Sequence, residues 1–515
     1  MNNRNLIHDL YGARNSADPA FLRPGRAALS TGAARDAVDR AAAALAACGV
    51  RQGDRVSVRV EKCVEAVLLA HACFTLGAVL HPMNTAYTPR EVDALLADAR
   101  PALLVCDPDE IATFAEPRRQ GFRVEGLRGD QGSFTDLTRA SEPVPAVADL
   151  PDHAPAALLY TSGTTGRPKG ALITHGNLAA NARALVEVWQ LGREDVLMHA
   201  LPAYHAHGLL TAINVMLTAG GAVCFLDRFE AGSVLHELPR CSVMMGVPTH
   251  YARLLKEPGL AAAANGAFRL AISGSAPLPP DTADRFRRVT GMEIIERYGT
   301  TEAAIITAIP PGTAGRRGWV GWPLPGVRVR VAGEDGRFES AATGVLETRG
   351  HNVFAGYWNR PEERAFTDDG WFVTGDIAEI DDRGCVRILG RETDVVISGG
   401  LNVYPKEVED ALDGLDGVAG SAVFGVPHPD FGEAVAAVVE SAAPASFDES
   451  ACIGYLKTEL ASYKVPKRII AVESIPRNEL GKVAKAALRE RYRDLFNPAE
   501  NVPSASSSER RGDDG

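Results

Sequence analysis

Closely spaced cysteines are absent from this 515-residue sequence. Its eight cysteines, at positions 48, 63, 73, 106, 224, 241, 385 and 452, form no CxxC pair and none of the short spacings typical of metal sites. The pattern argues against a cysteine-based metal centre and against a disulfide-stabilised secreted scaffold. We therefore expect reduced thiols, most of them buried.

Long hydrophobic runs are also missing. The longest, AVLLAHACFTLGAVL at 66–80, contains His71, Thr75 and Gly77 and falls short of the roughly 20 residues that a membrane-spanning helix needs. The N-terminal stretch MNNRNLIHDLYGARN lacks the apolar core of a secretory signal. We expect a cytoplasmic protein with no membrane partner.

Positive charge is in deficit. Lys and Arg number 54 against 65 Asp and Glu, which gives a formal net charge of −11. This balance argues against a nucleic-acid partner, and a site for an anionic ligand must be built from a few placed cations. Hydrophobic residues make up 46% of the chain and charged residues 23%. The composition is globular, and the length favours more than one domain at roughly 100 to 200 residues each.

Helical and strand-like patterns alternate along the first three hundred residues. Residues 33–48 and 63–76 have the helical spacing of apolar positions, and residues 55–60 alternate like a strand. A second round of alternation begins near Ala156 and ends near Gly299. Alternation of this kind predicts parallel sheets covered by helices on both faces. The further elements expected in the first round are a helix at 89–99, with Pro89 in its first turn, and a strand at 102–106.

The pattern changes after residue 319. Short alternating strands with Gly and Pro turns, as in GVRVRVAGEDGRF, predict a small β-rich subdomain. Residues 497–515 are polar and Ser-rich, which is typical of a disordered tail. The expected fold is therefore α/β. A large N-terminal domain, residues 1–392, would hold two doubly wound α/β subdomains plus the β-rich subdomain, and residues 393–496 would form an α+β C-terminal domain.

The loop YTSGTTGRPKG at 160–170 is rich in hydroxyls and glycines. Glycines let backbone amides turn toward an anion, and Lys169 adds positive charge. Gly163, Gly166 and Lys169 lack the GxxxxGK[ST] spacing of a P-loop, and the following ALITH looks like a strand rather than a helix. A hydroxyl-rich loop between two strands can wrap the β- and γ-phosphates of ATP without being a kinase-type P-loop. A flexible Gly/Ser/Thr hairpin with no ligand is the alternative.

Four further motifs follow this loop: ERYGTTEA at 296–303, WFVTGDIA at 371–378, GRETDVVISGGLNVYPKEVE at 390–409 and RNELGKVAK at 477–485. In this order and spacing the five motifs resemble the acyl-adenylate-forming superfamily, which includes acyl-CoA synthetases, luciferases and peptide-synthetase adenylation domains. The resemblance covers about residues 30–490. It implies ATP and CoA as co-substrates, Mg²⁺ as cofactor and a C-terminal domain that is mobile.

The resemblance also implies an ATP site, residue by residue. Thr301 would contact the α-phosphate, and Glu302 would bind Mg²⁺, a hard cation that prefers oxygen ligands. Asp376 and Arg391 would hold the ribose hydroxyls. The residues expected around the phosphates are Thr161, Ser162, Gly163, Thr164, Thr165 and Lys169, and those expected in the rest of the nucleotide site are Gly274, Ser275, Ala276, Glu296, Tyr298 and Gly299.

Lys482 is the expected catalytic lysine. Asn478, Gly481 and Lys482 match the superfamily's mobile lysine, which bridges the substrate carboxylate and the α-phosphate while negative charge builds there. In-line displacement is promoted by electrostatics and positioning, so no general base is expected. The remaining members of the expected catalytic set are Lys169, Thr301 and Glu302.

The C-terminal domain is expected to serve a second half-reaction. Its segment SGGLNVYP at 398–405 resembles the part of the superfamily that lines the pantetheine tunnel after the domain rotates. The hinge would lie near Thr393, where many relatives have Lys or Asp, and this departure bears on the rotation rather than the chemistry. The residues expected to contact CoA are Ser398, Gly399, Gly400 and Leu401.

Arg297 is the residue that indicates most about which carboxylic acid is the substrate. Many relatives that activate monocarboxylates have glycine in this place, just before Tyr-Gly. A buried arginine calls for an anionic partner, and a second carboxylate on the substrate offers bidentate geometry. Pairing with a structural acid is the alternative. The stretches HALPAYHAHGLL, MMGVPTHYARLL and ISGSAPL resemble the malonyl-CoA synthetases, which implies substrate roles for His207, Met245, Val247 and Thr249 as well.

The sequence departs from the malonyl pattern near the expected pocket. Thr300 stands in place of the usual methionine and Ala303 in place of the usual threonine, while Ile305 and Ile306 are more apolar than expected. These changes can reshape the pocket for methylmalonate or another 2-substituted malonate. The expected function is an ATP- and Mg²⁺-dependent ligase that converts malonate and CoA to malonyl-CoA, releasing AMP and pyrophosphate.

Four alternatives remain. The first is a ligase for another short-chain carboxylic acid, and the second is a phosphotransferase that releases ADP, against which the missing GK[ST] counts. A non-catalytic binding protein is disfavoured because the catalytic residue types are present. An adenylation domain serving a carrier protein is disfavoured because no carrier domain follows. No stable protein partner is expected.

Overall fold

Two compact units make up the protein. The computed structural model describes residues 5–12, 14–115, 121–144, 146–161, 168–313, 318–332, 342–398, 401–477 and 481–496. The first unit is Met1–Ile388 and the second is Leu389–Gly515. The domain boundary expected after residue 392 stays a prediction. All eight cysteines are free thiols, and all but the half-buried Cys63 are buried.

A six-stranded sheet forms the first layer of the first unit. Its strand order is β6-β5-β3-β4-β7-β8. Neighbouring strands are parallel, as expected for strands joined by helical crossovers, except that β8 runs antiparallel to β7. The strands are β3 (Arg55–Arg59), β4 (Val79–Pro82), β5 (Leu103–Cys106), β6 (Arg123–Gly126), β7 (Pro155–Thr161) and β8 (Lys169–Thr174).

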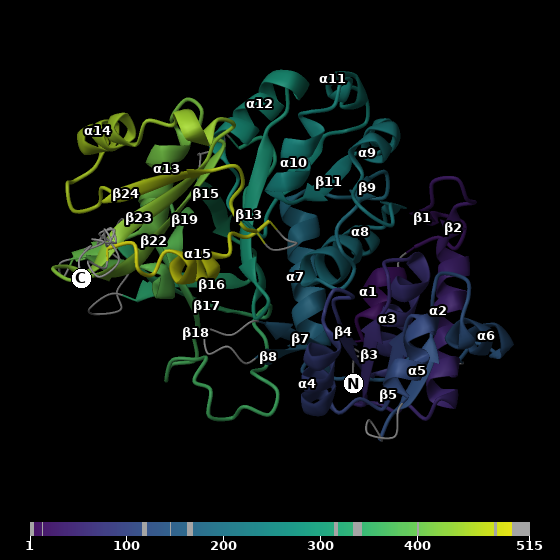
Figure 1. Cartoon of the computed structure of the whole chain (residues 1–515). Coiled ribbons are helices and arrows are strands. Elements are labelled where there is room, and N and C mark those ends of the chain that lie inside the picture. The colour runs from purple at the N-terminus through teal and green to yellow at the C-terminus, as the bar shows by residue number, and fades with distance from the viewer. Residues whose placement is uncertain are drawn as a thin grey trace, which may run out of the picture. The chain divides into compact units, whose positions relative to one another are not determined.

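Buried helices flank this sheet. The long apolar run of the sequence is helix α3 followed by β4, and nearly all of the helix is buried. Helix α2 packs against α3 and α6 (Figure 1). No helix among the described ranges is long and apolar enough to cross a membrane. The helices of this layer are α2 (Thr31–Ala47), α3 (Val64–Leu76), α4 (Pro89–Ala99), α5 (Ile111–Phe114) and α6 (Ser133–Ala140).

A thirteen-stranded sheet runs through the rest of the first unit. Its order is β16-β17-β18-β19-β15-β14-β13-β12-β11-β9-β10-β1-β2. The stretch from β13 to β1 is parallel. These strands are β1 (Pro19–Leu22), β2 (Leu29–Ser30), β9 (Val196–His199), β10 (Ala222–Phe225), β11 (Val243–Gly246), β12 (Leu270–Ser273) and β13 (Ile294–Thr300). The helices are α1 (Ile7–Tyr11), α7 (His175–Val188), α8 (Asn214–Thr218), α9 (Ala231–Glu237), α10 (Pro248–Leu254), α11 (Leu260–Ala263) and α12 (Pro280–Thr290).

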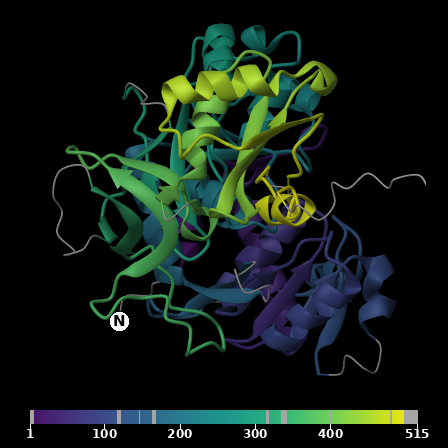
Figure 2. The same ribbon diagram turned by 60° about the vertical axis from the view of Figure 1, so that its left-hand side comes forward.

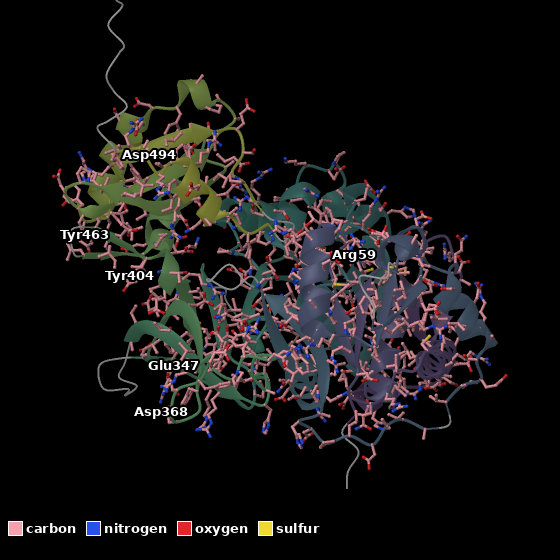
Figure 3. The ribbon with its side chains drawn as sticks, turned by 60° about the horizontal axis from the view of Figure 1, so that its bottom comes forward. Arg59, Glu347, Asp368, Tyr404, Tyr463 and Asp494 are labelled. Carbon is pink, nitrogen blue, oxygen red and sulfur yellow. The ribbon has the colours of Figure 1, made fainter. Side chains whose placement is uncertain are left out.

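The β-rich segment expected after residue 319 continues this same sheet. Strand β14 pairs antiparallel with both β13 and β15, so no break separates the parallel strands from the antiparallel ones. Glu347 and Asp368, labelled in Figure 3, belong to this region, where Glu347 is ion-paired with Arg330. The strands are β14 (Ala304–Ala308), β15 (Trp319–Pro323), β16 (Val327–Ala332), β17 (Ala342–Gly350), β18 (Phe372–Ile380) and β19 (Val386–Arg391).

The second unit is an α+β fold with its own apolar core. Its strand order is β21-β20-β23-β22, and β24 pairs in parallel with β23. Helix α15, the deeper yellow of the two yellowish helices in Figure 2 and the one right of centre, packs against β22. The elements are β20 (Val396–Ser398), β21 (Leu401–Val403), α13 (Pro405–Asp413), β22 (Gly420–His428), β23 (Gly432–Glu440), α14 (Glu449–Glu459), β24 (Arg468–Val472) and α15 (Lys485–Arg491). The expected tail, 497–515, lies outside the described residues.

Candidate active site

Several of the expected site residues lie at or just after the carboxyl ends of parallel strands. Strands β9, β11 and β12 end at His199, Gly246 and Ser273, and β13 continues to Thr300. In open α/β sheets ligands bind at this edge, because loops that follow neighbouring strands meet there. The loop after β12 begins with Gly274, which the sequence places in the nucleotide site.

Strand β13 presents different residues on its two faces. Side chains alternate along a strand, so Glu296 and Tyr298 share one face and Arg297 lies on the other. The Tyr298 hydroxyl donates to the carboxylate of Asp376 in β18, and the Glu296 carboxylate accepts from the backbone N–H of Leu278 at 3.3 Å. Two residues expected to bind the nucleotide, Tyr298 and Asp376, are thus in direct contact.

Arg297 is buried, with 7% of its surface exposed. Its guanidinium lies on Gly274, where a Cβ atom would be only 2.4 Å from Nε. Burial lowers the pKa of Arg297 to about 10, so the group stays charged at neutral pH. Its Nη2 is buried without a hydrogen-bond partner. Among the described residues no carboxylate pairs with Arg297, so the alternative of a structural acid partner finds no support in that part of the chain.

His207 lies in the π-helix η3 (Ala206–Ile213) and is also buried. Its Nδ1 is 3.1 Å from Oγ of Ser275, and its Nε2 is buried without a partner. Burial and the nearby charge of Arg297 hold the pKa of His207 well below its ordinary value, so the ring is neutral. If the Ser275 hydroxyl donates to Nδ1, the neutral ring carries its proton on Nε2, where a ligand oxygen could accept it.

The backbone at Ser275 is strained. Its φ is 70°, in the left-handed region that non-glycine residues rarely adopt, and such strain persists where the surroundings impose it, often at functional sites. Met245 and Val247 are buried at the end of β11, and Thr249 is half-buried in α10. An apolar cavity of about 10 Å³ lies nearby, and its lining includes Ala206, the residue before His207, and Thr301.

The turn between β13 and β14 carries Thr301 and Glu302. The Thr300 hydroxyl accepts from the backbone N–H of Ala303 at 3.1 Å and closes the turn. Gly299 is required here, because a Cβ atom would be 1.9 Å from the carbonyl oxygen of Ala304. A tight turn therefore holds the backbone of the two expected phosphate-site residues.

Lys169 begins β8, directly across the β7–β8 ladder from Thr161. Its Nζ is 2.8 Å from the Glu363 carboxylate and 5.6 Å from the centre of the Tyr357 ring. Tyr357 in turn donates its hydroxyl to Glu302 at 3.0 Å. Neither Tyr357 nor Glu363 was identified from the sequence. The expected residues Ser162, Gly163, Thr164 and Thr165 lie outside the described residues.

Lys62 is a third residue that sequence reasoning missed. Its Nζ donates to the carbonyl of His199 at 3.1 Å and to the carbonyl of Leu226, and it lies 4.4 Å from the centre of the Phe225 ring. Burial lowers the pKa of Lys62 to about 7. The available signal was a lysine placed just before an apolar run.

The second unit carries the remaining expected residues. Lys482 is exposed, and the carbonyl of the preceding Gly481 accepts from Arg477 at 3.1 Å. Ser398 is buried in β20, while Leu401 in β21 is 50% exposed. Arg391 is exposed at the end of β19, the strand in which the first unit ends at Ile388 and the second begins at Leu389. Gly399 and Gly400 lie outside the described residues, as does Asn478.

Comparisons with known proteins agree over most of the chain. The family model of the AMP-binding enzymes matches residues 11–358, and that of the AMP-binding enzyme C-terminal domain matches residues 407–482. A feruloyl-CoA synthase from Amycolatopsis is 35% identical over 486 residues, covering 93% of this chain and 97% of that protein. The mitochondrial malonate–CoA ligase of Homo sapiens is 33% identical over 486 residues, covering 86% and 84%.

A solved structure extends the likeness to three dimensions. ATP-bound MatB from Rhodopseudomonas palustris matches with a TM-score of 0.92 and 44% identity, covering 96% of this chain and all of that chain. Both the sequence expectation of the superfamily and that of the α/β fold are confirmed. The chain belongs to the AMP-binding enzyme family and is an acid–thiol ligase of the acyl-CoA synthetase class.

Proposed function

We propose that this ligase activates malonate, forming malonyl-AMP and then malonyl-CoA. The proposal depends above all on two buried nitrogens without hydrogen-bond partners, Nη2 of Arg297 and Nε2 of His207. A buried donor left unpaired costs about 1–3 kcal/mol, and a ligand that accepts from both removes that cost. The distal carboxylate of a small dicarboxylic acid is such a ligand.

The electrostatics of the pocket support an anionic substrate. The pKa of His207 is lowered first by burial and then by the positive charge of Arg297. At neutral pH the buried rings of His207, His199 and His250 are neutral, because burial lowers the pKa of each, whereas Arg297 keeps its charge. A substrate that brings a second negative charge supplies the partner that this buried charge lacks.

Identity alone does not select the acid, because the feruloyl and malonate ligases are similarly distant from this chain. We propose that Arg297 distinguishes dicarboxylates from monocarboxylates. A monocarboxylate such as ferulate or acetate would leave Arg297 buried and unpaired, and sites of this kind reject such analogues by roughly 10⁴- to 10⁵-fold. A ligase for another short acid remains the second candidate.

The same site would discriminate only weakly between malonate and methylmalonate. The apolar cavity beside Ala206 and Thr301 is the candidate place for a methyl group on C2. One methyl group changes selectivity by only about 1–3 kcal/mol, so we propose malonate as the first substrate and methylmalonate as the second.

The proposed ATP site combines residues from the β7–β8 strand pair, from strands β13 and β18, and from the turn between β13 and β14. Thr161 and Lys169 would hold the terminal phosphates, Tyr298 and Asp376 the nucleoside, and Thr301 the α-phosphate. Glu302 fits a Mg²⁺ ion, which is usually bound by one or two carboxylates together with substrate phosphates. No three or more metal-ligating side chains gather anywhere in the described ranges. When bound, Mg²⁺ neutralises charge on the phosphates.

The proposed chemistry has two steps. A carboxylate oxygen of malonate attacks the α-phosphorus, the bond to the bridging oxygen breaks, and pyrophosphate leaves with the electron pair. Lys482 would stabilise the negative charge at that phosphorus, and no base is needed because the acid is already ionised. The CoA thiol then attacks the acyl carbonyl, releases its proton, and AMP leaves.

The test is AMP release with ATP, Mg²⁺ and CoA across malonate, methylmalonate, succinate, acetate, butyrate and ferulate, with each thioester identified by mass. We expect malonate to lead and the monocarboxylates to fail. Release of ADP in place of AMP would instead identify the phosphotransferase.

Arg297→Ala is the first variant to test. It should lower kcat/KM for malonate on the order of 10⁴-fold, because the distal carboxylate loses its charged partner. Arg288→Ala, which removes an exposed arginine of α12, is the matched control and should behave as wild type. Retention of most malonate activity by Arg297→Ala would contradict the dicarboxylate assignment.

A further inference from the structure

Tyr357 lies between the two groups expected to hold the phosphate end of ATP. Its hydroxyl donates to Oε1 of Glu302 at 3.0 Å, and its ring centre is 5.6 Å from Nζ of Lys169. A lysine ammonium within about 6 Å of an aromatic ring is attracted to the ring face. One half-buried side chain therefore contacts both the expected metal ligand and the expected phosphate ligand.

The backbone around Tyr357 joins the same two elements. The N–H of Trp358 donates to the carbonyl of Gly170 at 2.7 Å, next to Lys169 in β8. The N–H of Phe354 donates to the carbonyl of Glu302, also at 2.7 Å. The segment 354–358 thus connects β8 to the turn between β13 and β14, and it sets where Tyr357 stands relative to both.

The Glu302 carboxylate depends on this contact. Within the described ranges, the Tyr357 hydroxyl is the side-chain partner of that carboxylate. A glutamate on a turn has several rotatable bonds, and fixing one rotamer before the ligand arrives lowers the entropic cost of binding. Lys169, by contrast, is also held by Glu363.

We propose that Tyr357 is a positioning residue for the phosphate site. Its hydroxyl orients the Glu302 carboxylate for Mg²⁺, and its ring orients the Lys169 ammonium, so that both face the triphosphate in a fixed relation. The inference rests on the proposed roles of Glu302 and Lys169 and goes beyond them, because Tyr357 acts through these two side chains.

The test separates the hydroxyl from the ring. Tyr357→Phe removes only the hydroxyl, Tyr357→Leu removes the ring as well, and Tyr11→Phe is the control, since it removes a tyrosine hydroxyl that contacts His71 at 2.8 Å. ATP affinity is measured by isothermal titration calorimetry in EDTA and in Mg²⁺. The same variants are assayed for KM and kcat, and their thermal unfolding is recorded.

We expect Tyr357→Phe to lower ATP affinity in Mg²⁺ by about tenfold or more, the usual effect of losing a partner of a metal ligand. Its ATP affinity in EDTA and its KM for the acid should stay at wild-type values. Tyr357→Leu should lose affinity in EDTA too. In a Glu302→Gln background, Tyr357→Phe should have no further effect.

Wild-type ATP affinity of Tyr357→Phe in Mg²⁺ would overturn the proposal, as would an undiminished effect of that change in the Glu302→Gln background. A different result would show that the proposed role of Glu302 as the Mg²⁺ ligand is itself wrong. If Glu302→Gln alone leaves ATP binding in Mg²⁺ intact, Glu302 is not the metal ligand and the proposal falls with it. Because the calorimetry uses no acid, its result does not depend on which acid is the substrate.

Discussion

At the scale of single residues, the position of the Arg297 side chain depends on the glycine at 274. The sequence assigns Gly274 to the nucleotide site, yet its missing side chain also makes room for the guanidinium of Arg297. A glycine with an ordinary backbone conformation gives no signal of this kind in the sequence. The requirement for glycine at position 274 becomes visible only in the folded chain, where β12 and β13 are neighbouring strands.

Gly274→Ala tests this relation. The new Cβ would overlap the arginine, so the guanidinium must shift by a distance on the order of 1 Å, which can cost about 100-fold in rate. We expect a rise in KM for malonate that exceeds any rise in KM for ATP. Gly192→Ala is the control, because a Cβ there meets nothing within 4 Å. A change confined to ATP would show that Gly274 serves the nucleotide alone.

At the scale of elements, local signals were sufficient for most helices and strands. Helix α4 spans Pro89–Ala99 as expected, because Pro89 starts it and Thr88 forms a capping box with Glu91. The expected strand at 102–106 is β5 (Leu103–Cys106). Such elements are predictable because periodicity and caps lie within a few residues.

Long-range pairing was beyond the sequence. The β-rich segment looks independent, but β15 joins it to β14 and hence to the parallel strands. The contact of Lys62 with the ends of β9 and β10 joins residues more than a hundred positions apart. The expected roles of the site residues remain predictions, since their positions alone do not test what they bind.

Lys62 gives a pH-dependent prediction at this scale. In the unfolded chain a lysine has a pKa near 10.4, whereas burial lowers the pKa of Lys62 in the folded chain to about 7. Between these values the unfolded state binds more protons, so Lys62 makes the free energy of unfolding rise with pH from about 7 to about 10. Below pH 7 this contribution is constant.

Lys62→Met should therefore flatten the rise. Thermal unfolding at pH 7, 8 and 9 measures the slope, and Lys457→Met, which changes an exposed lysine, is the control. Parallel pH profiles for wild type and Lys62→Met would contradict the buried-lysine explanation.

At the scale of the whole molecule, the expected functions divide between two units. Arg297, Lys169 and Glu302 belong to the first unit, while Lys482 belongs to the second. In the proposed mechanism Lys482 serves only the adenylation step. Loss of this lysine should therefore separate the two half-reactions.

We expect Lys482→Ala to lower malonate-dependent exchange of pyrophosphate into ATP by about 100- to 1,000-fold, the typical effect of removing one charge-stabilising group. Thioester formation from synthetic malonyl-AMP and CoA should persist at a near wild-type rate. Lys457→Ala serves as the surface control. Equal loss of both half-reactions would contradict a role confined to adenylation.

Strand β13 has a consequence for how such enzymes diversify. Its seven residues place Glu296 and Tyr298 on one face and Arg297 on the opposite face. In the proposed site, a change at position 297 would alter which acid is bound while leaving the face that would hold ATP as it was. A single substitution there would then give access to a new substrate without altering the ATP chemistry.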